Sequence, residues 1–303
     1  MATFSSMTDE VIRKLAGYTL RQDRQTYVYN DLGTPVSSTD LTIQVKDAKN
    51  ISNGIIEIDN ELIYVESYDR DTGILTIPPY GRGYNGTSAS SHAVGAKVVI
   101  SPTFPSLDVK NAINETILSL FPNVYATNSY TFTFSPAKST YTLPNDLESV
   151  LSVSFETIGP SKEWIPVRSW RVDPMANIDA FGSLNSLSIY SGVPAGKTVQ
   201  VFYAAQPSPM ESNSDDFETT TGLPASCKDL VVLGAAYRLV SYIDPGRLTF
   251  GSAEADQNSQ IAGRSYGAGS NAAKYLYALY QQRLQDETNK LQGRNPIRVH
   301  YTL

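Results

Sequence analysis

Four segments with helical spacing alternate with two long stretches of strand pattern, and this alternation limits the possible folds more than any other feature of the chain. The predicted helices cover 8–20, 107–121, 224–243 and 271–292. Each carries apolar residues that must be buried against another element, and helices far apart in a sequence can still pack into one bundle. The sequence therefore predicts an α+β fold in which two β modules interrupt a helical bundle.

The boundaries of these parts follow from the changes of pattern. We predict a discontinuous bundle over 1–24, 106–126 and 222–293, a first β module over 25–105, a second β module over 127–221, and a C-terminal tail over 294–303. Both modules are expected to be of small barrel or sandwich type. Residues 55–77, IIEIDNELIYVESYDRDTGILTI, read as a meander of three short runs separated by turn residues, which we expect to be part of a small barrel.

The predicted helix at 224–243 has almost no polar face, because apolar residues occupy nearly every position from Leu230 to Val240. A helix that is apolar all round is buried on all sides, either inside a bundle or between subunits. The helix at 271–292 has an apolar stripe of its own. As the core of the bundle or of an oligomer we select Leu230, Leu233, Tyr237, Leu276, Tyr280 and Leu284.

The last helix also carries charged residues at i,i+4 spacing, which we interpret as exposed ion pairs: Arg283–Glu287 and Asp286–Lys290. Gly293 is expected to end it. Of the remaining segments, 206–221 reads as a loop, and 251–270 reads as a mobile connection or a weak helix.

The composition favours a protein that is partly covered by neighbours. Charged residues make up 18% of the chain, against roughly 25% in an average soluble protein. The 19 tyrosines suit interfaces, although tyrosine on β-strands explains them equally well. The net charge of −6 implies no general affinity for nucleic acid, yet an acidic wall could line a channel through which DNA slides without sticking.

The same inventory excludes several classes of protein. The single cysteine, Cys227, rules out an intramolecular disulfide and a multi-cysteine zinc site, and we expect its thiol to be buried. The N-terminus lacks the apolar core of a signal peptide, and the longest apolar run is too short to span a bilayer. We therefore expect a soluble protein that is intracellular when made.

No motif in the sequence supports catalysis, a cofactor or a metal. The match of 81–86 to GxGxxG lies in a β-meander and not before a helix, so we expect a tight loop there. The Asp69-x-Asp71-x-Gly73 pattern lacks the other ligands of a calcium loop and fits a hairpin turn. With only His92 and His300 present, a catalytic triad is not supported, and we expect His92 to be a loop residue bonded to backbone.

A group of acidic residues in the meander could imitate the carboxylate pair of a glycosidase. Glu57, Asp59 and Glu61 alternate with apolar residues, as the outward-facing residues of a strand would. We therefore expect these carboxylates to be solvated.

Two stretches resemble known proteins. Ile56–Asp59 with Tyr64, Arg82-Gly83 with Gly86-Thr87, and His92 with Val98 resemble a small β module found in virion proteins of tailed bacteriophages. The C-terminal YQQRLQDETNKLQGRNPIR resembles the end of phage head-to-tail adaptor proteins, also called head completion or connector proteins. The helical bundle with inserted β modules is similar to that family as well.

The resemblance implies a structural and non-enzymatic virion protein. Such adaptors form a homo-oligomeric ring, typically of about twelve subunits, beneath the portal protein in the neck of the virion. The ring extends the channel for double-stranded DNA, without binding the DNA specifically, and offers a platform for tail proteins such as a tube, terminator or nozzle. Assembly is expected in the host cytoplasm, with no membrane involved.

In these adaptors a C-terminal extension often inserts into the portal. We therefore predict a portal-docking tail formed by Arg294, Pro296, Ile297, Arg298, Val299 and Tyr301. One alternative is a tail-tip or fibre-attachment protein that binds protein or glycan through its β modules. A second alternative is a virion glycan hydrolase, which would depend on Glu57 or Glu61.

Overall fold

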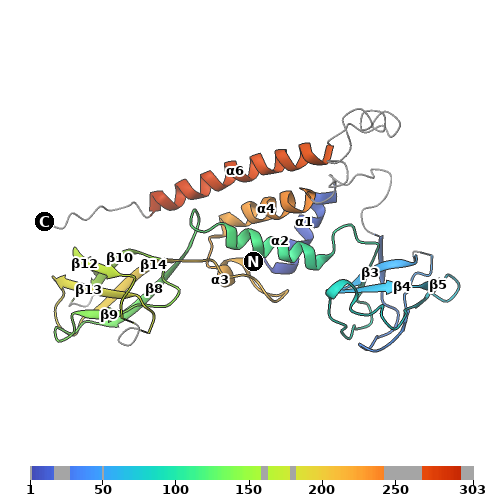
Figure 1. Ribbon diagram of the computed structural model, residues 1–303, viewed down its shortest axis with the longest axis horizontal. Helices are drawn as coiled ribbons and strands as arrows, with labels where there is room; N and C mark the ends of the chain where they lie inside the picture. The colour runs from blue at the N-terminus through green and yellow to red at the C-terminus, as the bar shows by residue number, and fades with distance from the viewer. Residues whose placement is uncertain are drawn as a thin grey trace. The chain divides into compact units, whose positions relative to one another are not determined.

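The computed structural model describes residues 2–16, 28–49, 51–157, 163–177, 182–241 and 268–294. It contains both helices and β-sheets, so the predicted α+β class is confirmed (Figure 1). The chain forms two compact units, one of residues 1–4, 114–231 and 278–303, the other of residues 5–113 and 232–277. The first β module lies in the second of these units and the second β module lies in the first.

The helices fall close to their predicted positions. They are α1 (Phe4–Ala16), α2 (Ser106–Ser119), α3 (Phe217–Thr221), α4 (Lys228–Ser241) and α6 (Ala268–Arg294). The short helix α3 lies in the segment predicted as a loop, and it ends at Gly222, which has the left-handed conformation that glycine allows. The prediction that Gly293 ends the last helix is wrong, because α6 continues through it to Arg294. Most of the predicted weak segment at 251–270 lies outside the described residues.

The first β module consists of two sheets that share one core. Its strands are β1 (Val28–Asp31), β2 (Thr42–Gln44), β3 (Gly54–Ile58), β4 (Glu61–Val65), β5 (Ser67–Asp69), β6 (Ile74–Thr76) and β7 (Lys97–Ile100). They form a sheet of order β1-β7-β3-β4 and a sheet of order β2-β6-β5. Val28 of β1 lies opposite Ile100 of β7, so the first and last strands of the module are neighbours. Buried residues from both sheets, among them Ile43, Ile56 and Leu75, make one hydrophobic cluster.

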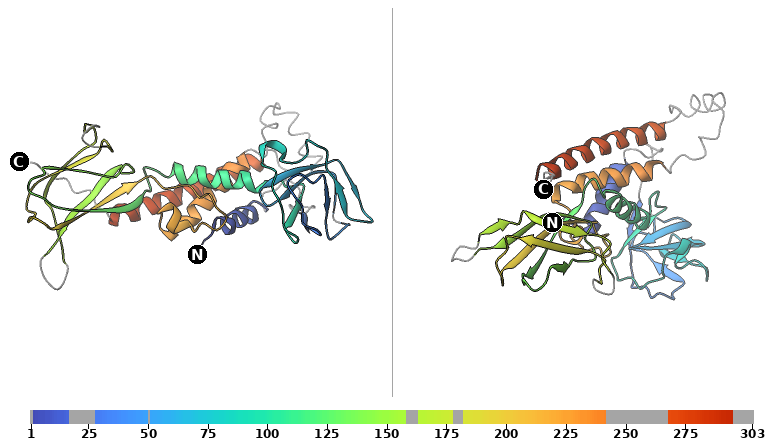
Figure 2. Two further views of the ribbon diagram at one scale, coloured as in Figure 1. Left: turned by 90° about the horizontal axis from the view of Figure 1, so that it is seen from below. Right: turned by 60° about the vertical axis from the view of Figure 1, so that its left-hand side comes forward.

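The second β module repeats this plan. Its strands are β8 (Ala126–Thr133), β9 (Thr140–Thr142), β10 (Ser149–Glu156), β11 (Trp164–Pro166), β12 (Ser169–Asp173), β13 (Ser186–Ser191) and β14 (Thr198–Ala205). They pair in the orders β11-β10-β14-β8 and β12-β13-β9. Among the described residues, the strands of neither module pair into a closed barrel (Figure 2), so of the two predicted forms, small barrel or sandwich, the barrel is wrong. In each module a four-stranded sheet and a three-stranded sheet bury their apolar faces together instead.

Helix α4 is buried almost throughout, as its lack of a polar face predicts. Every residue from Leu230 to Ala236 is buried, and Leu239 and Val240 are buried as well. At the start of α4, Asp229 forms an ion pair with Arg283 of α6, and further along the ring of Tyr237 packs edge-on against Tyr277. These contacts place α4 beside α6 in antiparallel order. The complete four-helix bundle and its domain boundaries remain a prediction.

Candidate functional site

The motif residues of the first β module converge on one buried carboxylate, that of Glu61. The β3–β4 turn includes Asp59 at a positive φ of 55°, and it places Glu61 at the first position of β4. The residue is only 1% exposed. The expectation that Glu57 and Glu61 are solvated is therefore wrong for both, since Glu57 is 2% exposed.

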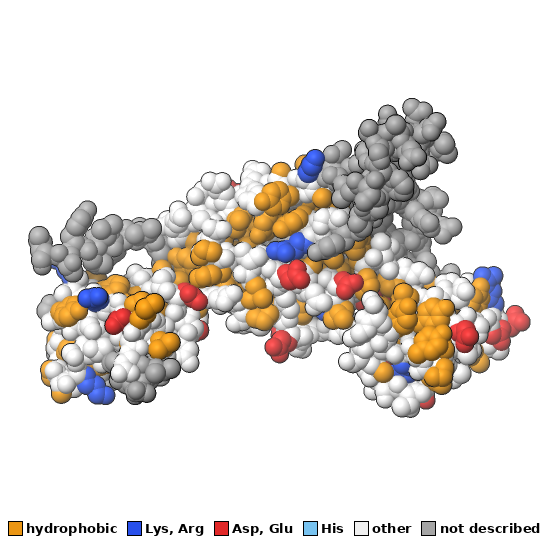
Figure 3. All heavy atoms as spheres, viewed as in Figure 1, with side chains coloured by type: hydrophobic (Ala, Val, Ile, Leu, Met, Phe, Trp, Pro, Cys, Tyr) orange, Lys and Arg blue, Asp and Glu red, His pale blue; other side chains and the backbone are white. Residues whose placement is uncertain are grey.

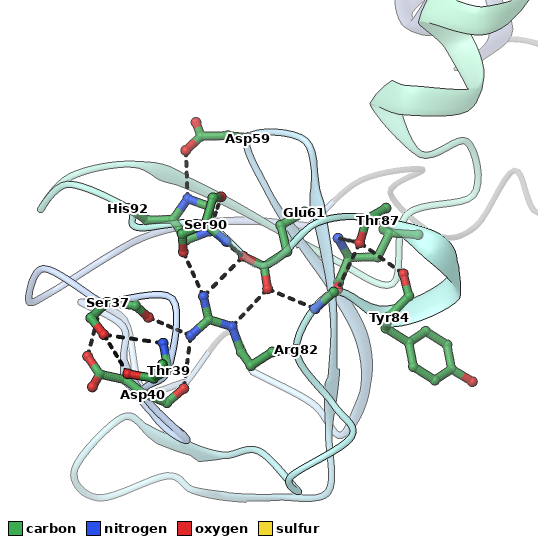
Figure 4. Close-up of polar contacts among 12 residues, drawn as sticks. Ser37, Thr39, Asp40, Asp59, Glu61, Arg82, Tyr84, Thr87, Ser90 and His92 are labelled. Atoms are coloured by element: carbon green, nitrogen blue, oxygen red, sulfur yellow. Dashed lines mark hydrogen bonds and ion pairs between the residues drawn. The ribbon is translucent and has the colours of Figure 1, made fainter.

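Five hydrogen-bond donors surround the Glu61 carboxylate (Figure 4). Nε and Nη2 of Arg82 donate to its two oxygens over 2.8 and 3.1 Å. The backbone N–H groups of Gly83 and Ser90 donate over 3.0 Å each, and Nε2 of His92 lies 2.8 Å away. Burial raises the pKa of Glu61, but the hydrogen bonds from Arg82, Ser90 and Gly83 outweigh burial and lower the pKa to about 2.

Arg82 is equally well satisfied. Its side chain is 6% exposed, and its remaining N–H groups donate to the backbone carbonyls of Ser37, Asp40 and Ser90 over 2.6–2.9 Å. All five N–H donors of the guanidinium therefore have a partner. The planar, forked geometry of arginine makes this arrangement possible, and lysine, with three donors on one atom, could not reproduce it.

His92 links this cluster to the β3–β4 turn. Its Nδ1 lies 2.8 Å from Oδ2 of Asp59, on the opposite side of the ring from Glu61. Its backbone also pairs with Val36 in both directions. The expectation that His92 bonds to backbone holds for its main chain but is wrong for its imidazole, which contacts the carboxylates of Asp59 and Glu61, about thirty residues away in the sequence.

Glu57 holds the module to a helix. Its Oε1 accepts a hydrogen bond of 2.6 Å from the backbone N–H of Ser106, the first residue of α2, where the positive end of a helix dipole favours a carboxylate. Nearby, Nζ of Lys110 donates to Oδ1 of Asn60. Burial is the largest influence on Glu57 and raises its pKa, while the bonds to Ser106 oppose that rise.

The Glu61 cluster positions the loop 78–92 and offers no free acid or base. A side chain at Gly81 would lie 2.6 Å from the carbonyl oxygen of Tyr64, and Gly83 has a φ of +59°, so both positions require glycine. The following turn at Tyr84–Gly86 is a short 3-10 turn and not the helix that a dinucleotide site needs. The predicted tight loop is confirmed, as is the predicted hairpin turn between β5 and β6.

Tyr80 and Tyr84 of this loop form an aromatic surface with Tyr64 of β4, which we call the tyrosine face. The ring of Tyr64 stacks with that of Tyr84 at a centroid distance of 5.6 Å and with that of Tyr80 at 6.2 Å. Tyr80 is 69% exposed. Figure 3 shows hydrophobic side chains gathered on the surface of this module. In the sequence, only the high tyrosine content indicated such a surface, and it did not indicate which tyrosines form it.

The core residues selected from sequence are mostly buried. Leu230, Leu233, Leu276 and Tyr280 are at most 8% exposed, whereas Tyr237 and Leu284 are half-buried.

The expectation of exposed pairs on α6 is wrong for Glu287, which is 2% exposed. It accepts hydrogen bonds from Ser226, Arg283 and Lys290, and these donors lower its pKa against the effect of burial. The predicted Asp286–Lys290 pair is replaced by one between Lys290 and Glu287 over 2.6 Å.

Of the predicted docking tail, only Arg294 lies within the described residues, at the end of α6. Pro296, Ile297, Arg298, Val299 and Tyr301 lie outside them. Within the described part of the chain, no group of histidine, cysteine and acidic residues could hold a metal ion. No described helix has the length and apolar character needed to cross a membrane.

The polar cluster around Glu61 is buried within the first β module and is bonded to side chains and backbone of the same module. Residues 94–300 match the family described as SU10 adaptor protein. The chain therefore belongs to this family of phage head-to-tail adaptors. No curated protein matches it. The match covers α2, the second β module, α4 and α6, and leaves out α1 and most of the first β module.

Proposed function

We propose that the protein is a non-enzymatic adaptor that forms a ring, of about twelve copies, beneath the portal in the virion neck. The ring extends the DNA channel and carries tail proteins below it, and subunits assemble in the host cytoplasm. The observation that carries this proposal is the match to the adaptor family over 94–300, which includes the helix leading into the tail. A net charge of −6 suits a wall that DNA passes without binding.

The contacts of α6 support a docking role for the tail, because they fix the point from which it leaves. Glu287, seven residues before Arg294, holds the side chain of Ser226 over 2.8 Å, and Arg283 reaches Asp229 over 3.6 Å. A buried carboxylate with several charged and hydroxyl donors resists displacement, since breaking such a group leaves an uncompensated charge. These contacts therefore hold in place the end of α6 from which the tail begins.

We propose that residues 294–303 dock on the portal. Arg294 and Arg298 would form charge-assisted hydrogen bonds with carboxylates or carbonyls there. Ile297, Val299 and Tyr301 alternate with polar residues, so they can be buried together on one side of an extended segment.

Deletion of 294–303 tests this docking role. We expect a folded protein that no longer joins DNA-filled heads, measured by co-sedimentation with heads and by infectivity of the assembled particles. Replacing Arg298 with alanine should weaken joining, whereas the matched control Lys274→Ala, which removes one exposed charge from α6, should not. Infectious particles assembled from the truncated protein would refute the docking role.

The tyrosine face favours a second candidate function, attachment of a protein or glycan through the first β module. This surface lies outside the part that matches the adaptor family, so an additional role there would not conflict with the adaptor role. Tyr80→Ala should then abolish attachment of the partner and leave joining to heads intact. The mass of the purified assembly tests the adaptor function itself, because about twelve copies support an adaptor, whereas three copies would favour a fibre-type protein in its place.

A further inference from the structure

Strand β8 is an unusually unprotected sheet edge. It is eight residues long, ATNSYTFT, with no charged residue, no proline and no bulge in its pairing with β14. Natural proteins normally protect an exposed edge with one of these features, because a bare edge pairs with other chains. Among the described residues, no strand pairs with the outer side of β8.

The backbone groups available at this edge can be identified from the register. The N–H of Phe134 donates to the carbonyl of Lys197 over 2.8 Å, just beyond the β14–β8 pairing. Groups alternate in direction along an antiparallel strand, so Phe132 and Tyr130 also bond towards β14. The N–H and C=O groups of Thr131 and its odd-numbered neighbours therefore point out of the sheet.

The hydrophobic core of the module is also incomplete at its two edges. One row of side chains crosses the four-stranded sheet, from Ile165 to Phe155, Val199 and Phe132. The two inner members are well buried, at 9% and 0% exposed. At the ends of the row, Ile165 is 43% exposed and Phe132 is half-buried.

The opposite edge, β11, complements β8. Val167 N–H and Glu163 C=O both bond towards β10, so Trp164 directs its N–H and C=O outwards, and Pro166 directs its C=O outwards. Because successive strands of this sheet are antiparallel, its two edges run in opposite directions. A second copy could therefore add its β11 to β8 and continue the same antiparallel order.

We propose that β8 of each subunit pairs with β11 of the next, so that the four-stranded sheets of successive copies join around the ring. The contact uses two different surfaces of one subunit, as a ring requires. It brings Ile165 of one copy against Phe132 and Tyr130 of its neighbour, and thereby completes the core at both edges. This inference rests on the ring of the proposed function and specifies the surface that builds it.

Disulfide trapping tests the proposal on the full-length protein. Trp164→Cys is combined in turn with Thr127→Cys, Ser129→Cys, Thr131→Cys and Thr133→Cys, all on the outer face of the sheet. Oxidation should give a ladder of linked subunits in one or two of the four combinations, because a disulfide requires close Cβ atoms. The native Cys227 can stay, since burial and Glu287 raise its pKa to about 12 and keep the thiol unreactive.

The outcomes separate this inference from the proposed function. Each variant with a single introduced cysteine should give no ladder. If a variant with a cysteine on β8 alone forms disulfide-linked dimers, two β8 strands pair with each other and the proposal is overturned. A ring seen by mass or on DNA-filled heads, without a ladder in any combination, also overturns it but leaves the adaptor function standing. A protein that forms no ring in either setting refutes both.

A proline variant gives an independent measurement. Thr131→Pro removes one outward N–H without touching the bonds to β14, and edge strands tolerate proline. We expect a folded subunit whose ring assembly is weakened at least about tenfold, whereas the control Thr131→Val, which keeps the N–H, should assemble normally. Unchanged assembly of the proline variant would contradict the proposal. If the proline variant does not fold, the disulfide ladder alone decides whether β8 pairs with β11.

Discussion

The two β modules have the same plan, a four-stranded sheet and a three-stranded sheet around one core, but they complete their cores in different ways. The first module has a buried ion cluster in which Glu61 and Arg82 satisfy each other and the surrounding backbone. The second has a hydrophobic core against which the aromatic side chains of Tyr130 and Phe132 on β8 are only half-buried. The difference indicates that the first module satisfies its buried polar groups within one chain, whereas the second, in the proposed assembly, gains cover for β8 from a neighbouring subunit.

The largest expected effect is on the ion cluster of the first module. Glu61→Ala leaves the buried guanidinium of Arg82 without its carboxylate, and loss of one partner of a buried pair costs about 3–5 kcal/mol. Hydrogen exchange should therefore accelerate in β3, β4 and the loop 78–92, and remain unchanged in the second module. The matched control is Asp31→Ala, which breaks an exposed pair with Lys46 and should cost at most about 1 kcal/mol. Equal effects of the two variants would refute the comparison.

An effect of the same size is expected within the second module. Phe155→Ala empties a buried position and should lower the free energy of unfolding by about 3–5 kcal/mol. Phe132→Ala at the edge should cost less in the isolated subunit, because part of its ring already contacts water. In the assembled ring the cost of Phe132→Ala should rise. Denaturant unfolding of the isolated subunit and of the ring measures the loss of unfolding free energy in each state. An equal loss in both states would show that β8 is not covered by a neighbouring subunit.

A smaller effect is expected from acid. The folded pKa of Glu61 is about 2, below the ordinary value of 4.5, so its contribution to stability is complete above about pH 4.5 and is lost as the pH falls towards 2. The folded pKa of Glu57 is raised, so its protonation on acidification favours the fold and partly offsets that loss. Glu57→Gln keeps an oxygen for Ser106 and removes this offset. The first module of that variant should lose stability more steeply with falling pH than the wild type, measured by hydrogen exchange.

The smallest effect concerns the thiol of Cys227, which is buried beside Glu287. A thiol reagent at pH 8 should leave the folded protein unlabelled, because burial raises the pKa of the thiol to about 12. Glu287→Gln should allow slow labelling by loosening α6 from Ser226. Labelling of the wild type at the rate of a free cysteine would contradict the buried position.

The sequence predicted the helices well, because apolar residues at helical spacing and the all-apolar stretch of α4 are local signals. It could not predict the ion cluster. The alternation around Glu57 and Glu61 shows that they share a face of a strand, but not that α2 and the loop 78–92 cover that face. The partners of Glu61 are 21 to 31 residues away, and only the folded chain brings them together.

The edge of β8 illustrates a further limit. Its run of uncharged residues can be read from the sequence, but its place at the side of a sheet depends on strand order, which is not a local property. The opposite edge, β11, is three residues long and gives no clear strand pattern. Their complementarity becomes visible only once the registers across all four strands are known.

The pairing of β1 with β7 gives the first module the ends of a cassette, by which we mean a domain that can be inserted into a chain or removed from it. Val28 lies opposite Ile100, so the chain enters and leaves the module at adjacent points, as is typical of domains that evolution inserts into or removes from a host protein. The match to the adaptor family begins at residue 94 and so leaves out all strands of this cassette except β7. A short linker in place of 28–100 should give a smaller adaptor, and a different cassette spliced in at the same points could give the neck of the particle a new binding specificity.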